Sequence, residues 1–208
     1  SPTEAEQELE SLLFEWPSHP GVRSGLARCR AARGRLEEAI EEQLLALSFD
    51  PMSPALATSL GFYRRAQGRH EQAVARFKQA LDLDPEWSIA RLELARCLLE
   101  VGEGRKAIEA LDLVKPAWGR FLQCVESGDR DGALKMLHDW ERRYESDYVA
   151  PYWLAERWMW LGDHERTMDW LERAFDDQQL QAIFVGIEPT FRPLHGLSRF
   201  QQILRLLG

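Results

Sequence analysis

Few residues in this chain have the types and spacing that would support catalysis or metal binding. The segment Gly102–Lys106 contains two glycines and a lysine, but it lacks the spacing of a phosphate-binding loop and fits a turn between helices. The five histidines never form a pair four residues apart, and no histidine and cysteine cluster has metal-ligand spacing. We therefore expect no enzyme activity, no cofactor and no metal.

The cysteines and the paired carboxylates also have structural interpretations. Cys29 and Cys97 fall at equivalent positions of a repeated pattern, where small buried residues are usual, so we predict packing roles with redox sensing as the alternative. Cys124 is interpreted in the same way. Carboxylate runs such as Glu37–Glu38 and Glu41–Glu42 fit the solvated outer face of a helix, without general acid-base chemistry.

The elements that must position these residues follow a 34-residue period. Prolines, glycines and alanines each recur at this interval: Pro17, Pro51 and Pro85; Gly34, Gly68 and Gly102; Ala39, Ala73 and Ala107. Apolar residues between these positions recur at helical spacing. The pattern predicts antiparallel helix-turn-helix units stacked into a solenoid, an architecture that presents surfaces to partners.

We predict one all-α domain over residues 1–208. Its expected parts are a half repeat at 1–19, repeats at 20–53, 54–87, 88–113, 114–147 and 148–180, and a C-terminal cap at 181–208. The interval from Gly102 to Gly128 is 26 residues, which predicts a shortened second helix near Asp112 in the third repeat. The amphipathic segment Phe200–Leu207 predicts a capping helix that covers the end of the array. Because the chain opens in mid-repeat, we expect a further segment upstream.

The most regular unit resembles a tetratricopeptide repeat. Its characteristic positions are matched by Leu60, Gly61, Ala73, Phe77, Ala80 and Pro85. The last third, with Pro151-Tyr152, Trp170-Leu171-Glu172 and the segment 188–200, resembles the C-terminal repeats of bacterial signalling proteins. In those proteins the repeats follow a winged-helix DNA-binding domain, an adenylate cyclase domain or a protein kinase domain. The resemblance implies a right-handed superhelix of about five repeats and a regulatory or sensory role.

Tetratricopeptide domains typically bind peptides or helices along their concave groove. The repeat phase places ten residues there: Arg28, Phe62, Arg65, Arg96, Leu99, Trp118, Tyr152, Trp153, Glu156 and Trp160. Aromatic rings and arginine often dominate binding energy, so we expect an acidic-aromatic ligand. The alternative for the tryptophans between Trp140 and Trp170 is that they fill the core.

Composition restricts the class of partner. A net charge of -8 and a pI near 5.2 disfavour direct nucleic-acid binding, and the chain has no apolar run long enough to contact a membrane as a span. The N-terminus is acidic, unlike a signal peptide. We expect a cytoplasmic location, or a periplasmic one if the full-length chain is membrane-tethered. The 22 arginines, 4 lysines and absence of asparagine are typical of a bacterial source.

These observations predict a non-catalytic protein-protein interaction module, the regulatory part of a larger bacterial signalling or transcription-regulatory protein. Its expected partner is a protein or peptide held in the groove. The alternative is a dimerisation or small-ligand-sensing domain that controls an upstream DNA-binding or cyclase domain. A homodimer, or a ligand-dependent shift in melting temperature, would distinguish the second hypothesis from the first.

Overall fold

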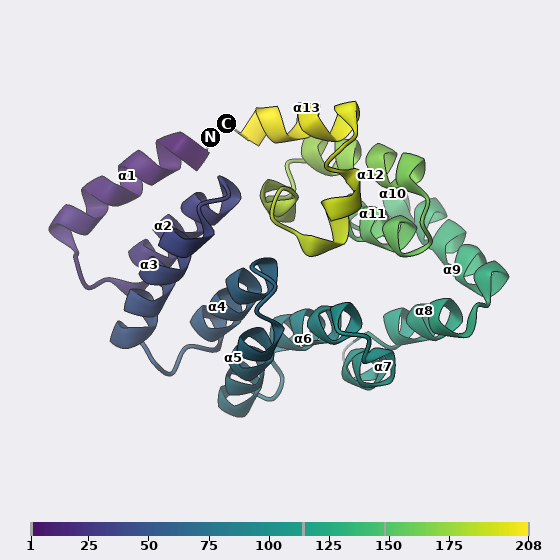
Figure 1. The fold of residues 1–208 in the computed structure, drawn as a ribbon, viewed down its shortest axis with the longest axis horizontal. Coiled ribbons are helices and arrows are strands. Elements are labelled where there is room, and N and C mark those ends of the chain that lie inside the picture. The colour runs from purple at the N-terminus through teal and green to yellow at the C-terminus, as the bar shows by residue number, and fades with distance from the viewer. Residues whose placement is uncertain (1, 114, 148, 208) are drawn as a thin grey trace. The chain divides into compact units, whose positions relative to one another are not determined.

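Helices form the regular secondary structure of the described part of the chain (Figure 1). The computed structural model describes residues 2–113, 115–147 and 149–207, and these contain no β-strand. In chain order the elements are α1 (Pro2–Glu15), α2 (Pro20–Ala32), α3 (Leu36–Phe49), α4 (Pro54–Ala66), α5 (His70–Leu83), α6 (Ser88–Glu100), α7 (Gly104–Asp112), α8 (Pro116–Ser127), α9 (Arg130–Arg142), α10 (Tyr144–Asp147), α11 (Pro151–Trp160), α12 (His164–Asp176), the 3-10 helices η1 (Leu180–Phe184) and η2 (Pro189–Leu194), and α13 (Ser198–Leu207). The predicted all-α repeat fold is confirmed.

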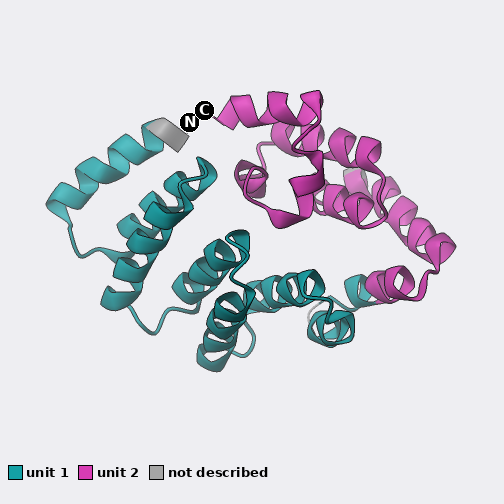
Figure 2. Cartoon of the chain, in the orientation of Figure 1, with its two compact units in different colours: residues 1–119, 208 teal, residues 120–207 magenta. Residues whose placement is uncertain are grey.

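The chain divides into two compact units, which we call unit 1 (residues 1–119) and unit 2 (residues 120–207) (Figure 2). Unit 1 contains α1 to α7 and the start of α8, and unit 2 contains the rest of α8 and the elements that follow. Helix α2 packs against α3, α4 against α5, α6 against α7, and α11 against α12. The prediction of one continuous domain stays a prediction, and its boundaries at residues 1, 114, 148 and 208 lie outside the described residues.

Left-handed glycines explain the periodicity of the turns. Five glycines have φ between +75° and +78°: Gly34, Gly68, Gly102, Gly128 and Gly162. In the first hairpin the Arg35 N–H donates to the Arg30 carbonyl, and the Gly34 N–H donates to the Ala31 carbonyl, both at 2.9 Å. This pair of hydrogen bonds is the Schellman arrangement that ends a helix, and it requires a residue tolerant of positive φ. The 34-residue glycine spacing is therefore a spacing of helix ends.

The first two hairpins share one register. Helices α2 and α4 begin and end 34 residues apart, and so do α3 and α5. The third hairpin keeps a 13-residue first helix in α6, but its second helix, α7, has 9 residues where α3 and α5 have 14. The shortened helix expected near Asp112 is confirmed.

Close packing in the second hairpin depends on Gly61. A Cβ atom placed at Gly61 would lie 2.5 Å from Cε1 of the fully buried Phe77 ring. Phe77 also packs with Ala73 of its own helix and with Cys97 of α6. The ring therefore joins the second hairpin to the third, as the repeat pattern predicts.

Helix α1 packs on α2 through apolar and ionic contacts. The Leu9 side chain lies against Gly25, within 3.2 Å of where a Cβ atom would be. The buried Glu6 carboxylate accepts hydrogen bonds from Arg33 at 2.9 Å, from Arg30 at 3.4 Å, and from Arg35. Burial alone would raise the pKa of the Glu6 carboxyl, but these guanidinium groups outweigh it and hold the pKa below its ordinary value.

Unit 2 has its own apolar core, and α13 covers part of it. Phe200, Ile203 and Leu207 of α13 are buried in the same cluster as Trp158 and Leu171. At the edge of this contact, Arg199 donates to both oxygens of Glu172, at 2.9 and 2.8 Å, and to Asp169 at 2.8 Å. The amphipathic C-terminal segment therefore forms a helix that packs on α12.

Candidate functional site

The groove candidates on α4 and α6 form a compensated ion cluster. Arg65 is completely buried, with its guanidinium 2.5 Å from Glu100 and 3.2 Å from Glu93. Arg96, also buried, pairs with the same Glu93 carboxylate. The Arg65 guanidinium lies over the ring of the half-buried Phe62, 5.4 Å from its centroid. A buried charge is costly unless it is paired, so Glu93 and Glu100 compensate these arginines, and Arg65 links α4 to α6.

The other candidates of unit 1 are more accessible. Arg28 is exposed on α2, and Leu99 is half-buried on α6. Trp118, on α8, is half-buried, and the Lys115 ammonium lies 5.7 Å from its ring centroid. Their role in ligand binding stays a prediction.

A histidine and a cysteine meet beside this ion cluster without forming a reactive site. The His70 Nδ1 atom lies 3.4 Å from the Glu100 carboxylate and 3.7 Å from Cys97 Sγ. Cys97 is completely buried, and burial, with a smaller effect of Glu100, raises the pKa of its thiol to about 11. A thiol in this state is a poor nucleophile, in agreement with the predicted packing role.

The candidates of unit 2 gather on α11. Glu156 pairs with Arg157, and both side chains are almost completely buried. The Arg157 guanidinium lies 5.7 Å from the Trp153 ring centroid and 4.7 Å from that of Trp160. The buried Tyr152 packs edge-to-face on Trp153, with centroids 5.6 Å apart. The structure thus places two half-buried tryptophans around a fixed guanidinium.

Sequence reasoning missed the charged partners in both units. Glu93 and Arg96 are spaced i, i+3, a signal that could have paired them, whereas Glu100 reaches Arg65 from another helix. Arg157 follows Glu156 directly in the chain, and two adjacent charged residues in a sequence do not indicate a buried ion pair.

The tryptophans divide between core and surface. Trp158 and Trp170 belong to the buried core of unit 2, while Trp140, Trp153 and Trp160 are half-buried and pack against it. The core interpretation is correct for the first two. The other three each expose part of a ring, and a binding role is compatible with that exposure.

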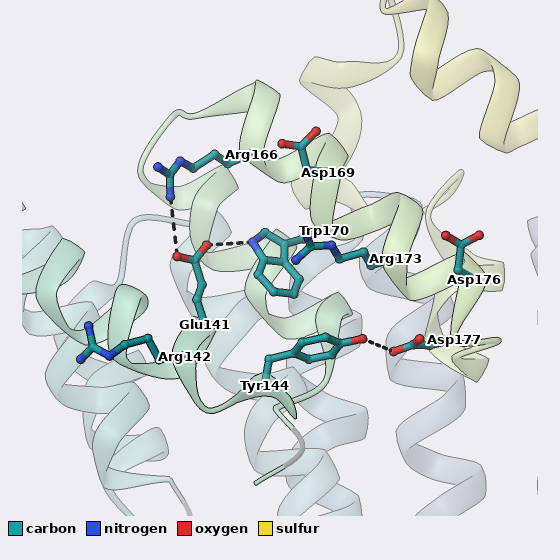
Figure 3. Close-up of a pocket in the computed structure, with 9 residues that line it drawn as sticks. All are labelled: Glu141, Arg142, Tyr144, Arg166, Asp169, Trp170, Arg173, Asp176 and Asp177. Carbon is teal, nitrogen blue, oxygen red and sulfur yellow. Dashed lines mark hydrogen bonds and ion pairs between the residues drawn. The ribbon is translucent and has the colours of Figure 1, made fainter. Parts of the chain in front are cut away.

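A separate open pocket of about 900 Å³ lies in unit 2, between α9, α10 and α12 (Figure 3). Its residues are Glu141, Arg142, Tyr144, Arg166, Asp169, Trp170, Arg173, Asp176 and Asp177. Glu141 accepts hydrogen bonds from the indole N–H groups of Trp158, at 2.8 Å, and Trp170, at 2.9 Å. Arg173 lies over the Trp170 ring, 4.4 Å from its centroid. This pocket could not be predicted from the sequence, because its wall combines residues of three helices.

The described residues contain no group of three or more His, Cys, Asp or Glu side chains placed to hold a metal ion. No helix among them is long and apolar enough to cross a membrane. These findings concern residues 2–113, 115–147 and 149–207.

Comparison with known proteins identifies the repeats. The family model of the tetratricopeptide repeat matches residues 1–60 and 64–117, more than half of the chain. The chain belongs to the tetratricopeptide repeat family. Members of this family are non-catalytic scaffolds for protein interactions, and this chain is a protein-interaction module. No curated protein sequence matches it.

Solved structures share the fold at low sequence identity. A tetratricopeptide repeat protein from Parabacteroides merdae is 15% identical, with a TM-score of 0.59, over 99% of this chain and 90% of its own. A human IFIT1 dimer with m7Gppp-AAAA is 19% identical, with a TM-score of 0.58, over 85% of this chain and 51% of its own. YrrB, described as a repeat protein with an unusual peptide-binding site, is 18% identical, with a TM-score of 0.50, over 88% of this chain and 98% of its own.

Proposed function

We propose that this tetratricopeptide chain binds an extended peptide or protein segment, and that the surface of α11 around Trp153 and Trp160 makes the main contact. The observation that supports this proposal most directly is the Arg157 guanidinium held between the two half-buried rings. Tryptophan and arginine are the residues most often found at the energetic centre of an interface.

The fixed arrangement favours binding. Arg157 is paired with Glu156, so the guanidinium that supports both rings is already ordered before a ligand arrives. Binding then loses less side-chain freedom than it would at a flexible surface. The remaining candidates, Arg28, Phe62 and Leu99, would extend the contact along the groove predicted from the repeat phase. Arg65 and Arg96 would act by holding α4 and α6 together.

We propose further that the chain is the regulatory part of a larger bacterial signalling or transcription-regulatory protein, located in the cytoplasm. The sequence resemblance of the last third supports this context. The charge of -8 favours a protein partner over a nucleic acid, although the similar IFIT1 structure holds m7Gppp-AAAA.

The test is a peptide-display selection against the chain, followed by titration of the enriched peptide by fluorescence anisotropy. We expect Trp153→Ala and Trp160→Ala each to weaken binding by about 2 kcal/mol, the loss typical of a hot spot. Trp16→Ala is the matched control, because Trp16 is 60% exposed and lies in the other unit. Unchanged affinity in both α11 variants, with their circular dichroism preserved, would disprove the role of this surface.

A second function, small-ligand sensing linked to dimerisation, is favoured by the pocket of Figure 3. Its volume of about 900 Å³ is at the upper end of ordinary ligand sites, and it combines an aromatic wall with charged groups. The Tyr144 hydroxyl donates to Asp177 at 2.9 Å, which fixes one side of the opening. A metabolite screen by thermal shift, repeated with Arg173→Ala, would test this function. A monomer that no metabolite stabilises would rule it out.

A further inference from the structure

A second, smaller pocket lies within unit 1, between α4 and α5, and it is lined by cations and amides. Its volume is about 370 Å³, and its residues are Leu60, Arg64, Gln72, Ala75, Arg76 and Gln79. No carboxylate is among them. In a chain with a net charge of -8, a pocket with two arginines and no acidic residue is unexpected.

The two arginines of this pocket make hydrogen bonds only to neutral partners among the described residues. Arg64 donates to the Gln67 amide oxygen at 3.3 Å, and Arg76 donates to the Gln79 amide oxygen at 2.8 Å. No ion pair joins either arginine to an acidic side chain within the described part of the chain. Both side chains are half-buried, so water compensates their charges only in part.

The first repeat shows what normally surrounds an arginine at this position. Arg30 stands 34 residues before Arg64 and occupies the same place on α2 as Arg64 does on α4. Four carboxylates surround the Arg30 guanidinium: Glu6 at 3.4 Å, Glu10 at 3.6 Å, Glu38 at 3.9 Å and Glu42 at 3.2 Å. Carboxylates from α1 and α3 therefore compensate the charge of this arginine.

The second repeat has kept the arginine and lost every one of these carboxylates. The residues 34 positions after the four glutamates are Ile40, Leu44, Gln72 and Arg76. Helices α1 and α3, α2 and α4, and α3 and α5 each begin and end 34 residues apart, so each replacement concerns equivalent positions on equivalent helices. At the position that corresponds to Glu42, the second repeat has a positive charge, Arg76.

The electrostatics of the pocket agree with this comparison. Burial is the largest cause that lowers the pKa of the Arg64 guanidinium, and the positive charges of Arg69 and Arg76 lower it further. The negative charge of Glu37 acts in the opposite direction. Glu37 is itself 3.5 Å from Arg69. A cation whose charged form is disfavoured gains free energy when an anion approaches it.

We propose that the pocket between α4 and α5 binds a carboxylate of an acidic side chain from the peptide partner. Arg64 and Arg76 take one carboxylate oxygen each, as Arg30 and Arg23 each take one oxygen of Glu42. The amides of Gln72 and Gln79 offer further donors, and Leu60 contributes an apolar surface for the methylene groups of a glutamate. This inference rests on the proposed function as a peptide-binding module, and it adds an acidic residue to the partner.

The test measures binding of a fluorescein-labelled hexaglutamate peptide to the full chain, with hexaglutamine as the neutral probe. We expect hexaglutamate to bind and the double variant Arg64→Gln, Arg76→Gln to weaken it about ten-fold or more, because hydrogen bonds to charged groups are each worth that factor. The matched control is Arg105→Gln, Lys106→Gln, which removes two exposed positive charges from α7 and should leave the affinity within about two-fold.

A second variant adds a measurement of stability to the measurement of binding. The change Gln72→Glu, Arg76→Glu rebuilds two of the carboxylates that surround Arg30 in the first repeat. We expect this variant to bind no hexaglutamate and to melt at a higher temperature than the wild type, since Arg64 then has partners of its own. A lower melting temperature would contradict the equivalence of the two sites.

Two outcomes would overturn the proposal. Equal affinity of hexaglutamate for the wild type and the Arg64→Gln, Arg76→Gln variant would place the anion elsewhere. Displacement of the probe by inorganic phosphate at the same concentration would show a site for small anions, without a role for a peptide. Either result leaves the Trp153 and Trp160 test untouched, because those variants lie on α11 and are measured with the selected peptide.

Discussion

The contact between Gly61 and Phe77 gives the sharpest test of the packing argument. A Cβ atom at residue 61 would lie 2.5 Å from Cε1, 2.8 Å from Cδ1 and 3.0 Å from Cζ of the Phe77 ring. Ordinary contacts of a Cβ atom begin at 3.4 Å. The ring cannot retreat easily, because Phe77 is completely buried and packs against Ala73 and Cys97.

Two opposing terms set the size of the effect of Gly61→Ala. Adding a methyl group to a filled core costs about 1–3 kcal/mol, and a clash with a rigid ring belongs in the upper part of that range. Alanine is more favourable than glycine inside a helix by about 1 kcal/mol. We therefore expect a net loss of about 1–2 kcal/mol in the free energy of unfolding.

The assay is urea unfolding followed by far-ultraviolet circular dichroism, carried out as a double-mutant cycle with Phe77→Leu. Leucine lacks the outer ring atoms that the new methyl group would meet. In the Phe77→Leu background, Gly61→Ala should become neutral or stabilising, because the gain in helix propensity remains while the clash is removed. The interaction energy between the two sites should be about 1–3 kcal/mol, the size of the clash that the leucine removes.

Gly196→Ala is the matched control, because no heavy atom lies within 4 Å of a Cβ atom added there. Its effect should stay within about 0.5 kcal/mol. Stabilisation of the wild-type protein by Gly61→Ala, or an equal cost beside phenylalanine and beside leucine, would show that no clash with the Phe77 ring occurs.

Three further predictions concern charged and thiol groups. The pKa of Glu6 is lower in the folded protein than in the unfolded chain. The Glu6 charge therefore contributes fully to the free energy of unfolding above the ordinary glutamate pKa, and this contribution is lost as the pH falls through the folded value. Glu6→Gln should cost about 2 kcal/mol at neutral pH and almost nothing in strong acid, measured by urea unfolding. Arg199→Ala should lower stability by about 1 kcal/mol, since this arginine is partly exposed, and should speed hydrogen exchange in α13. At mildly alkaline pH, iodoacetamide should label Cys124, which is half-buried, before Cys97.

Each of these predictions has a result that contradicts it. A cost of Glu6→Gln that does not change with pH would mean that the carboxylate charge is unimportant. Unchanged exchange in α13 of the Arg199→Ala variant would show that apolar contacts alone hold this helix. Labelling of Cys97 in the folded state as fast as Cys124 would contradict its burial.

The helices and the turns could be predicted from the sequence alone. Glycine most easily adopts the positive φ at which a Schellman bond pair ends a helix, so the intervals between Gly34, Gly68 and Gly102 give the repeat length directly. The small residues of the second hairpin and the 26-residue interval after Gly102 likewise predicted the close approach at Gly61 and the short α7. These features are local, because the backbone conformation and the neighbouring turn of helix decide them.

Which charges are compensated depends on contacts between helices, and it could not be predicted from the sequence. The 34-residue period gives Arg30 and Arg64 the same position on their helices, and Arg65 follows Arg64 directly. Yet Arg30 has four carboxylate neighbours, Arg65 is buried between Glu93 and Glu100, and Arg64 lines a pocket without an acidic residue. The partners of Arg65 lie on a different helix, at distances in the sequence that no local pattern fixes. Whether an arginine is paired depends on which side chains the neighbouring hairpins place beside it. These tertiary contacts distinguish a structural arginine from one that we propose to bind a ligand.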